Sequence, residues 1–552
     1  MRLVWRIGGK AGEGINNAGL IFAKTFMRAG FHVFMNTELP SLIRGGHNIA
    51  TVRVDDKKIA CPVNGVDILV ALDQTTADSY REESKNIVFG EGVKAEGFFV
   101  PLQGVVDEVG GDSVMRNSVA LGFSIGLAGL DFKFLKNVLE DDFKSKGETV
   151  LGANLKCAEK GFEIASKLKF HMVLEPLKSE GKESKRILIS GNHAIAFGSL
   201  KGGCRFFSAY PMTPASPMME YLAPLERDLG IVMKQVEDEI AAVNMAIGAS
   251  YAGARSMAFT SGGGFSLMVE GLGLSGMTET PVVIAEVQRP GPSTGLPTRT
   301  GQEDFKFVLS ASQGEFPRIV VAPGDCEELF EESTRLFNLV EKYQVPGILL
   351  SDKFLSESFV DCAPLETQIK NERFLIDKTA GVYKRYSLTE TGVSPRAVPG
   401  SDLIFRSTSD EHDEEGYFDE DAENRVKMTE KRWGKVKFIK KDLKKPELVD
   451  NGGDLTLVGT GSTKNVIREA VEVLKGKVKV NHLHVLYLSP FQEEVVKILE
   501  SAGTVVCVEN NYTGQLASIL RENGFEVDYH LLKFDGRPFT VDEVVERVLN
   551  LR

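Results

Sequence analysis

The chain is 552 residues long, carries a formal net charge of −12 and contains six cysteines. This length is too great for one compact core and predicts about three or four domains. The acidic balance argues against general binding to nucleic acid or to anionic membranes. No apolar run reaches the ~20 residues of a membrane helix, and the short, charged start of the chain differs from a signal peptide. We therefore expect a cytoplasmic protein with neither nucleic acid nor a membrane as its partner.

The cysteines are scattered, and no two of them lie within four residues of each other. Zinc and iron–sulfur sites usually carry close-spaced cysteine pairs, so the sequence predicts no metal site in this chain. Scattered thiols fit a reducing compartment, where cysteines behave as small buried apolar side chains.

The N-terminal region alternates strands and helices. A buried strand is predicted over Leu3–Ile7, a glycine-rich turn over Gly8–Gly14, a helix over Ile15–Ala29 and a second strand over Phe31–Met35. A strand, a glycine loop, a helix and a strand in this order begin a doubly wound sheet. We expect residues 1–175 to form one Rossmann-type domain.

The glycine loop is a candidate cofactor site. Gly9, Gly12 and Gly14 would let backbone N–H groups approach a phosphate at a helix N-terminus, where an anion is favoured. A dinucleotide fingerprint needs glycine where Ala11 stands, so a nicotinamide cofactor is the weaker alternative. A phosphate-bearing cofactor and a tight packing turn both remain open. The nearby loop with Arg44 offers further donors, or is a solvated turn.

The rest of the chain divides into three parts after a charged linker. Residues 186–362 alternate strands and helices and predict a second α/β domain. Residues 363–449 are rich in charge and predict a surface excursion, with His412 as an ordinary surface histidine in a solvated run. Residues 450–552 begin with a strand and a glycine turn and predict a third α/β domain. The alternation implies mostly parallel sheets throughout.

Two motifs of the second domain place polar groups among apolar segments. Prolines bracket Met212 and Thr213 in the run Tyr210–Pro214, so the Thr213 hydroxyl has little freedom. That suits recognition of a carboxylate or carbonyl, although a rigid turn is the simpler interpretation. Glu239 ends an acidic run before a helix of small residues. Its carboxylate either stabilises the helix N-terminus or faces a buried cavity and handles a proton.

Further candidates follow predicted strands. Because ligands bind at the carboxyl ends of parallel strands, we expect Ser261 and Gly262, which follow the strand from Ser256, to contact a cofactor. Arg289 follows the next strand in the same way, and Arg299 lies in the loop beyond it. An arginine at such an edge can bind a carboxylate through two parallel hydrogen bonds.

In this order the motifs resemble the 2-oxoacid:ferredoxin oxidoreductases, specifically an α subunit with a γ domain fused at its N-terminus. The resemblance covers nearly the whole chain. The segments that carry it are residues 9–14, 44–46, 52–53, 191–214, 239–250, 288–300, 409–416, 427–433, 458–462 and 508–516.

The resemblance implies a γ-like domain over residues 1–175, a thiamine-enzyme pyrimidine-type domain over 186–362 and a transketolase C-terminal-like domain over 450–552. The family decarboxylates a 2-oxoacid on thiamine diphosphate, forms an acyl-CoA and passes electrons to ferredoxin. A separate β subunit is expected to hold the diphosphate, magnesium and an iron–sulfur cluster, so the chain should act in a hetero-oligomer. The γ-like domain would help to cover coenzyme A. Residues 409–416 and 427–433 fit a segment of family members that use 2-oxoglutarate or several 2-oxoacids, which favours 2-oxoglutarate.

The resemblance also assigns roles. Glu239 would hydrogen-bond the aminopyrimidine ring of thiamine, Thr213 would contact substrate or thiamine, and Tyr210 would bind substrate. Arg289 would pair with the substrate carboxylate, and Arg299 is the second candidate. The alternatives are a member of the family specific for pyruvate or another 2-oxoacid, a non-oxidative thiamine enzyme of transketolase-like fold, and a non-catalytic scaffold that binds a nucleotide or CoA.

Overall fold

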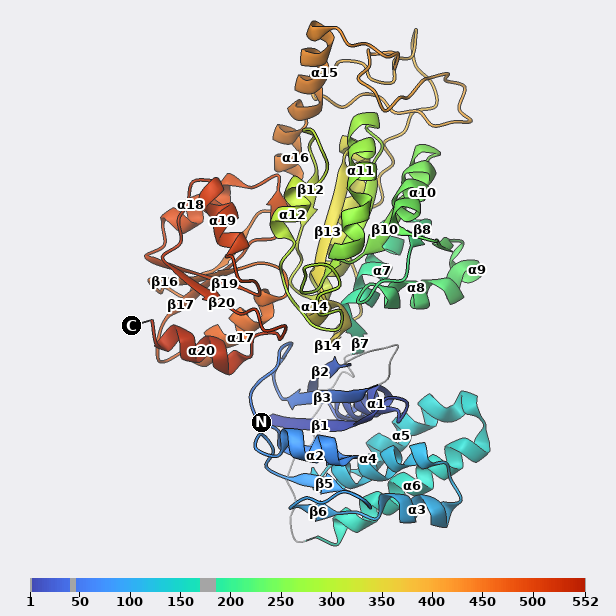
Figure 1. The fold of residues 1–552 in the computed structure, drawn as a ribbon, viewed down its shortest axis with the longest axis vertical. Coiled ribbons are helices and arrows are strands. Elements are labelled where there is room, and N and C mark those ends of the chain that lie inside the picture. Colours follow the sequence, from blue (N-terminus) through green and yellow to red (C-terminus); the bar gives the residue numbers. More distant parts are fainter. Residues whose placement is uncertain (1, 40–45, 169–184, 552) are drawn as a thin grey trace. The chain divides into compact units, whose positions relative to one another are not determined.

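The computed structural model describes residues 2–39, 46–168 and 185–551, which form two compact units (Figure 1). Of the described residues, the first unit takes in those up to 189 together with 358–364 and 540–542, and the second takes in 190–357, 365–539 and 543–551. The predicted α/β class with mostly parallel sheets is confirmed. Among the described helices, none combines the length and the apolar character needed to cross a membrane.

The first unit is built on an eight-stranded sheet in the order β6-β5-β4-β1-β3-β2-β14-β7. Its strands are β1 (Arg2–Lys10), β2 (His32–Glu38), β3 (His47–Asp55), β4 (Ile68–Ala71), β5 (Ile87–Phe89), β6 (Phe98–Phe99), β7 (Ile187–Ser190) and β14 (Phe359–Cys362). Its helices are α1 (Ile15–Arg28), α2 (Gln74–Tyr80), α3 (Leu102–Val109), α4 (Arg116–Leu127), α5 (Phe132–Phe143) and α6 (Glu148–Ser166).

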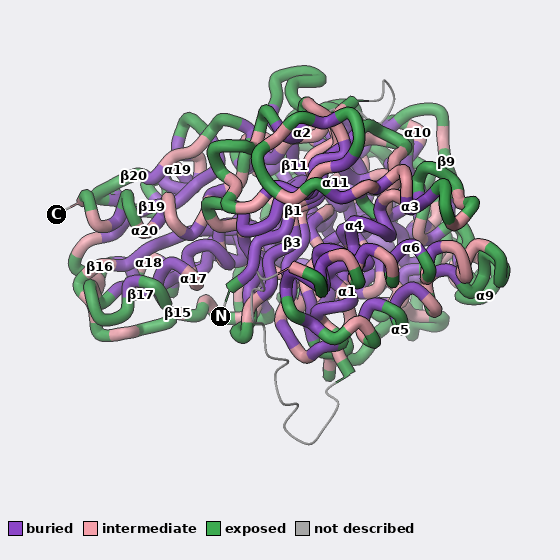
Figure 2. Tube along the Cα trace, turned by 90° about the horizontal axis from the view of Figure 1, so that it is seen from below, coloured by how far each residue is buried: buried purple, intermediate pink, exposed green. Residues whose placement is uncertain are grey.

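Aromatic packing holds this sheet to its helices. The ring of Trp5 in β1 stacks on Phe22 of α1 with the ring centroids 4.2 Å apart, and both side chains are fully buried. Figure 2 shows β1 and β3 among the buried segments of the chain. Burial of large aromatic side chains contributes most to a core of this kind.

Two details of the first unit differ from the sequence-based expectation. β1 runs on through Lys10, so Gly9 is paired with Asn48 in the sheet and is not part of a turn. β3, which was not predicted, pairs antiparallel with β1 and β2, so this sheet is mixed. Its alternation of polar and apolar residues is typical of a strand, but the glycine- and histidine-containing run before it reads as a loop.

A seven-stranded sheet forms the centre of the second unit, in the order β18-β12-β13-β11-β10-β8-β9. Its strands are β8 (Phe206–Ala209), β9 (Val232–Gln235), β10 (Ser256–Thr260), β11 (Val282–Gln288), β12 (Ile319–Val321), β13 (Pro346–Asp352) and β18 (Tyr487–Ser489). The helices of this region are α7 (Gly191–Lys201), α8 (Ser216–Leu222), α9 (Glu226–Leu229), α10 (Glu239–Tyr251), α11 (Gly262–Thr278), α12 (Phe305–Ser310), α13 (Cys326–Tyr343) and α14 (Lys353–Glu357). Among the described residues, the strands of this sheet pair in parallel, with the exception of β18, which runs antiparallel to β12, so the carboxyl ends of β8, β10, β11 and β13 meet at one edge.

The C-terminal part of the chain adds a five-stranded sheet in the order β15-β17-β16-β19-β20. Its strands are β15 (Glu447–Val449), β16 (Leu455–Gly459), β17 (Val480–His484), β19 (Thr504–Glu509) and β20 (Tyr529–Leu532). The remaining helices are α15 (Ala422–Gly434), α16 (Val436–Asp442), α17 (Thr463–Leu474), α18 (Glu493–Glu500), α19 (Gln515–Glu522) and α20 (Val541–Leu549).

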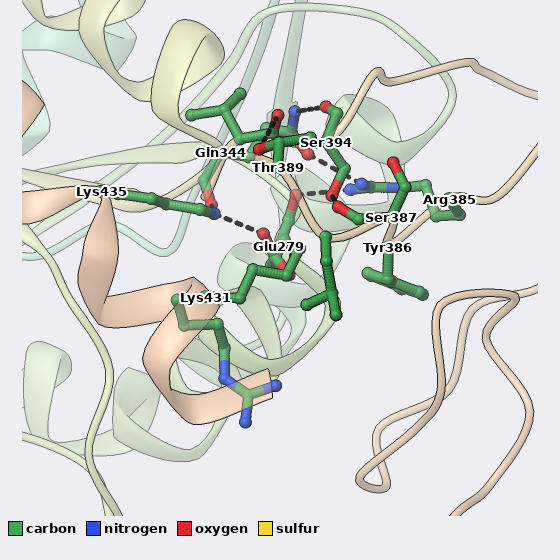
Figure 3. A network of polar contacts seen from close by, with 12 residues as sticks. Glu279, Gln344, Arg385, Tyr386, Ser387, Thr389, Ser394, Lys431 and Lys435 are labelled. Atoms are coloured by element: carbon green, nitrogen blue, oxygen red, sulfur yellow. Dashed lines mark hydrogen bonds and ion pairs between the residues drawn. The ribbon is translucent and has the colours of Figure 1, made fainter. Parts of the chain in front are cut away.

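The charged region after residue 363 is anchored by buried ion pairs, contrary to the expectation of a solvated excursion. The Nζ atom of Lys431 lies 2.5 Å from one oxygen of Glu279, and Lys435 pairs with the other oxygen. Arg385 donates 2.8 Å to the Glu279 carbonyl and 2.8 Å to the amide oxygen of Gln344 (Figure 3). All three charged side chains of the carboxylate–lysine cluster are almost completely buried, so α15 and α16 are fixed to the end of α11.

The prediction that His412 lies on the surface is also wrong, because this residue is fully buried. Its ring packs on Tyr386 with centroids 3.8 Å apart. The neighbouring Glu411 accepts hydrogen bonds at 2.9 and 2.6 Å from Arg432. Glu411 is thus neutralised by Arg432 from another segment of the chain, which a composition count cannot distinguish from solvation.

Candidate functional site

The candidate site lies at the first turn of α11, where β10 ends. Helix α11 begins at Gly262, so the glycine triplet Gly262–Gly264 lies within the helix. A methyl group at Gly264 would overlap the Thr260 hydroxyl and the Glu239 carboxylate, and one at Gly262 would overlap the carboxylate of Asp304. Two acidic side chains therefore reach the positive end of this helix because its first turn has no side chains.

Glu239 is the first residue of α10, and Asp238 before it is the cap, accepting from the backbone N–H of Ala241 at 2.7 Å. The side chain of Glu239 is therefore not needed to cap the helix. Its side chain is 3% exposed, and its Oε1 atom has no hydrogen-bond partner among the described residues. Burial raises the pKa of Glu239, the charge of Asp238 adds to this, and Arg289 opposes it. Such a carboxylate can accept or hold a proton.

Arg289 extends from the end of β11 and donates from Nη1 to the carbonyl oxygen of Thr213 at 2.6 Å. The structure thereby joins the proline-bracketed turn, whose Thr213–Pro214 peptide is cis, to the predicted arginine. The Nε atom of Arg289 is buried and has no partner among the described residues. Burial lowers the pKa of Arg289, while Asp304 and Glu239 raise it. The guanidinium is fixed at one end and retains donors for a ligand.

A cavity of about 570 Å³ opens beside these groups. Its lining includes Met212, Gly262, Gly263, Arg289 and Asp304, together with the loop that follows Arg289. This volume is in the range of small-molecule sites, and the mixture of an arginine, an acid and glycines is typical of them. The arrangement can hold a carboxylate at Arg289 while Glu239 contacts a second group.

The other predicted site residues are placed less centrally. Tyr210 is 41% exposed at the end of β8, and Arg299 is half-buried and does not line the described cavity. Ser261 is fully buried, with its hydroxyl unpartnered among the described residues, so it lies behind the cavity and not in it. Their assignment to substrate or cofactor stays a prediction.

The glycine loop of the first unit is occupied by a side chain of the chain itself. The Glu13 carboxylate accepts from the backbone N–H of Lys10 at 2.7 Å and pairs with Arg116 at 2.9 Å. Gly12 and Gly14 have positive φ angles of 91° and 74°, which explains their identity by backbone geometry. A phosphate bound by this loop would displace Glu13 from Lys10, so contacts from Gly9, Gly12 and Gly14 remain predictions. Arg44 lies outside the described residues.

Sequence reasoning missed Asp304 and Glu286. Asp304 ends the loop after Arg289 and lines the cavity, and Glu286 lies within β11. An acid within the otherwise apolar run 282–287 of this strand was the available signal for Glu286, because charged side chains are almost never fully buried without a reason.

Comparison with known proteins gives two family models that match in chain order. Residues 4–164 match the model of pyruvate ferredoxin/flavodoxin oxidoreductase, and residues 198–431 match that of pyruvate flavodoxin/ferredoxin oxidoreductase, thiamine diphosphate-binding. The second model spans the whole candidate site.

Relatives and a solved structure agree with these models. The 2-oxoacid:ferredoxin oxidoreductase subunit alpha of Sulfolobus sp is 34% identical over 100% of this chain and 97% of its own length. The 2-oxoglutarate synthase subunit KorA of Methanothermobacter marburgensis is 30% identical over 67% of this chain and 100% of its own. The 2-oxoglutarate:ferredoxin oxidoreductase from Magnetococcus marinus, solved with 2-oxoglutarate, coenzyme A and succinyl-CoA bound, is 33% identical with a TM-score of 0.91, covering 100% and 99% of the two chains. The chain therefore belongs to the 2-oxoacid:ferredoxin oxidoreductase family as an alpha subunit, and it is part of an oxidoreductase.

Proposed function

We propose that this chain supplies the substrate-side half of a thiamine-dependent site that oxidises 2-oxoglutarate to succinyl-CoA and passes the electrons to ferredoxin. A β subunit would complete the site and carry the diphosphate, magnesium and an iron–sulfur cluster. The observation that carries the proposal is a buried Glu239 oxygen with no partner among the described residues, which lies within electrostatic reach of the fixed guanidinium of Arg289 in the cavity wall. The KorA relative and the Magnetococcus marinus enzyme, whose names specify 2-oxoglutarate, support this choice of substrate.

The residues present fit the aminopyrimidine end of thiamine diphosphate. The Oε1 atom of Glu239 is a buried acceptor with no donor among the described residues, which is costly unless a ligand supplies one. When bound, thiamine diphosphate supplies the electron sink that decarboxylation of a 2-oxoacid requires. Glu239 would then accept a hydrogen bond from the aminopyrimidine ring, and this bond would fix the direction in which the ring is polarised. Burial, by keeping the pKa of Glu239 high, suits it to exchange a proton at that atom.

Arg289 would bind the carboxylate of the 2-oxoacid. Its Nη1 atom is anchored on the Thr213 carbonyl, so the remaining donors are oriented before substrate arrives. A guanidinium offers a planar pair of donors that matches a carboxylate. Thr213 therefore acts on the substrate at least through its backbone, by positioning Arg289.

An exposed apolar face indicates where the β subunit would dock. Ile240 and Met245 of α10 and Leu267 of α11 are 52%, 38% and 49% exposed, and the two helices pack against each other. Gly248 lies in the interior of α10, and a methyl group there would meet nothing within 4 Å. A glycine in a helix costs about 1 kcal/mol relative to alanine. Because no neighbouring group within the chain requires a glycine at this position, the glycine suits the close approach of a backbone from another chain. This face adjoins Gly263, which lines the cavity.

The test is reconstitution with the β subunit, coenzyme A and a viologen dye, with 2-oxoglutarate, pyruvate and branched 2-oxoacids compared. We expect CoA-dependent dye reduction that is fastest with 2-oxoglutarate. Glu239→Gln should retain assembly and lose about 10²-fold or more in turnover, the scale of a proton-transfer group. Glu237→Gln is the matched control, because Glu237 belongs to the same acidic run but is exposed. Wild-type turnover in Glu239→Gln would remove this residue from the reaction, and thiamine turnover without dye reduction would favour a non-oxidative enzyme.

A further inference from the structure

Behind the cavity wall lies a carboxyl group that has no donor to stabilise it. Glu286 points from β11, the strand between β10 and β13, and is fully buried. Among the described residues, no N–H or O–H group donates a hydrogen bond to either of its oxygens. An isolated carboxylate in such a place would cost several kcal/mol, whereas the neutral acid would not.

The groups nearest to Glu286 are themselves acids. The carboxyl of Asp304 lies in hydrogen-bonding contact with it, and Asp352 at the end of β13 acts on it electrostatically. Asp352 has its own donors, the Thr300 hydroxyl at 3.2 Å and the Leu355 N–H at 3.0 Å. Contact between the carboxyls of Glu286 and Asp304 becomes a hydrogen bond only when one of them carries a proton.

The side chain of Asp304 does not cap the helix, although its position suggests that role. It stands at the cap of α12, yet its side chain accepts no hydrogen bond from that helix. The side chain instead packs against Gly262 at the start of α11 and lines the cavity with Arg289. Its backbone N–H is held by the amide oxygen of Gln288 at 3.1 Å. Asp304 is therefore in contact with the buried acid on one side and the cavity on the other.

The charges around the cavity do not balance for an anionic ligand. The carboxyl groups of Asp304 and Glu239 act electrostatically on Arg289, the single cationic residue among the described lining residues. Glu303 lies next to Asp304 and adds a further negative charge, although its carboxylate accepts from the Gly291 N–H at 2.9 Å. The carboxylate of a 2-oxoacid that binds at Arg289 brings one more negative charge to this place, and like charges in a site of low dielectric repel strongly.

We propose that Glu286 and Asp304 share one proton in the resting site and take up a second proton from solvent when an anionic substrate binds beside Arg289. This inference rests on the proposed function for the identity of the substrate. The first proton stays on Glu286, since burial and then the charges of Asp304 and Asp352 raise its pKa well above the ordinary value. Burial, followed by the charge of Glu303, raises the pKa of Asp304 to about 6, so this carboxylate is poised to accept the second. Asp304 is thus a positioning residue that sets the charge met by the substrate.

The shared proton can be tested in the chain without substrate or partner. Glu286→Gln replaces a neutral acid by a neutral amide of the same shape, so its melting temperature between pH 6 and 8 should equal that of the wild-type chain. If Glu286 were ionised, the substitution would remove a buried charge, raise the melting temperature and change its pH dependence, which would overturn the proposal.

The second proton is tested in the αβ complex with oxamate, an analogue of a 2-oxoacid that is not decarboxylated. Calorimetric titration in two buffers of different ionisation enthalpy should show proton uptake approaching one per site at pH 7 in the wild type and in Glu286→Gln. Uptake should be absent in Asp304→Asn. No uptake in the wild type, or equal uptake in Asp304→Asn, contradicts the proposal.

The KM of the 2-oxoacid gives a readout that a structural role does not change. In the wild type KM should rise with pH above about 6, by up to tenfold per unit, the limit for one linked proton. Asp304→Asn should show an equal or lower KM that does not change with pH over this range, because the carboxamide of asparagine does not titrate. A KM raised equally at every pH would mean that Asp304 only holds structure. If the complex oxidises no 2-oxoacid at all, the proposed function fails, while the melting comparison still decides the shared proton.

Discussion

Gly264 tests the placement of Glu239 without touching a titratable group. Alanine is preferred over glycine in a helix interior by about 1 kcal/mol, so a site with room should become more stable. At Gly264 the added methyl would overlap the Thr260 hydroxyl and the Glu239 carboxylate. Overpacking of this kind costs about 1–3 kcal/mol. The two effects leave Gly264→Ala between neutral and about 2 kcal/mol destabilised, with the Glu239 carboxylate forced out of position.

Gly248→Ala is the matched control, because it is the same change in the neighbouring helix with nothing within 4 Å of the new methyl. In the single chain it should stabilise by about 0.5–1 kcal/mol, so the two variants should differ by about 1–3 kcal/mol. Differential scanning calorimetry should show this as a separation of several degrees in the transition of the second unit, at about 2–4 °C per kcal/mol. In the αβ complex Gly264→Ala should lose turnover by the same order as Glu239→Gln. Equal melting temperatures together with full activity would show that the Glu239 carboxylate does not lie against α11.

Two further substitutions test the buried charges around α15. Glu279→Gln leaves Lys431 and Lys435 buried without a carboxylate and should destabilise the chain by about 3–5 kcal/mol, measured by urea unfolding; an unchanged midpoint would contradict the buried cluster. Burial alone would raise the pKa of Glu411, but hydrogen bonds from Arg432 and then Arg425 lower it from 4.5 to about 2. Its stabilisation is therefore complete above about pH 5 and is lost as the pH falls toward 2, so Glu411→Gln should be less stable at pH 7 and show a shallower acid slope in near-ultraviolet circular dichroism.

The sequence was sufficient to single out Glu239 and Arg289 as candidates, and the structure places the two within electrostatic reach of each other. Glu239 and Arg289 stand directly after apolar strands, or at the start of a helix, and parallel topology brings such positions to one edge. The link between them was not predictable. The hydrogen bond from Arg289 to the Thr213 carbonyl depends on the backbone path of a proline-rich turn, which no residue pattern encodes.

The buried acids were missed for a different reason. A sequence shows charge but not its partner, so Glu411 within an acidic run reads as solvated, although Arg432 neutralises it from a helix about twenty residues away. Asp304 looks like a helix cap, because aspartate is preferred there. Only the three-dimensional arrangement shows that the carboxyl group of Asp304 contacts the carboxyl group of Glu286 instead. Pairings of this kind depend on packing between elements and not on local propensity.

The glycine triplet at the start of α11 shows how this changes the interpretation of a motif. In the sequence, glycines after a strand favour close approach of an anionic cofactor to backbone N–H groups. In the structure, carboxylates of the chain itself, from Glu239 and Asp304, lie against Gly264 and Gly262. The helix terminus, whose partial positive charge stabilises an anion by about 0.3–1 kcal/mol, is thus already facing two acids. An incoming 2-oxoacid gains little from that terminus, and its carboxylate must be bound by a full positive charge. Arg289 supplies such a charge in the described cavity lining, so if the proposed function holds, the protonation of Asp304, and not the glycines, should control how tightly substrate binds.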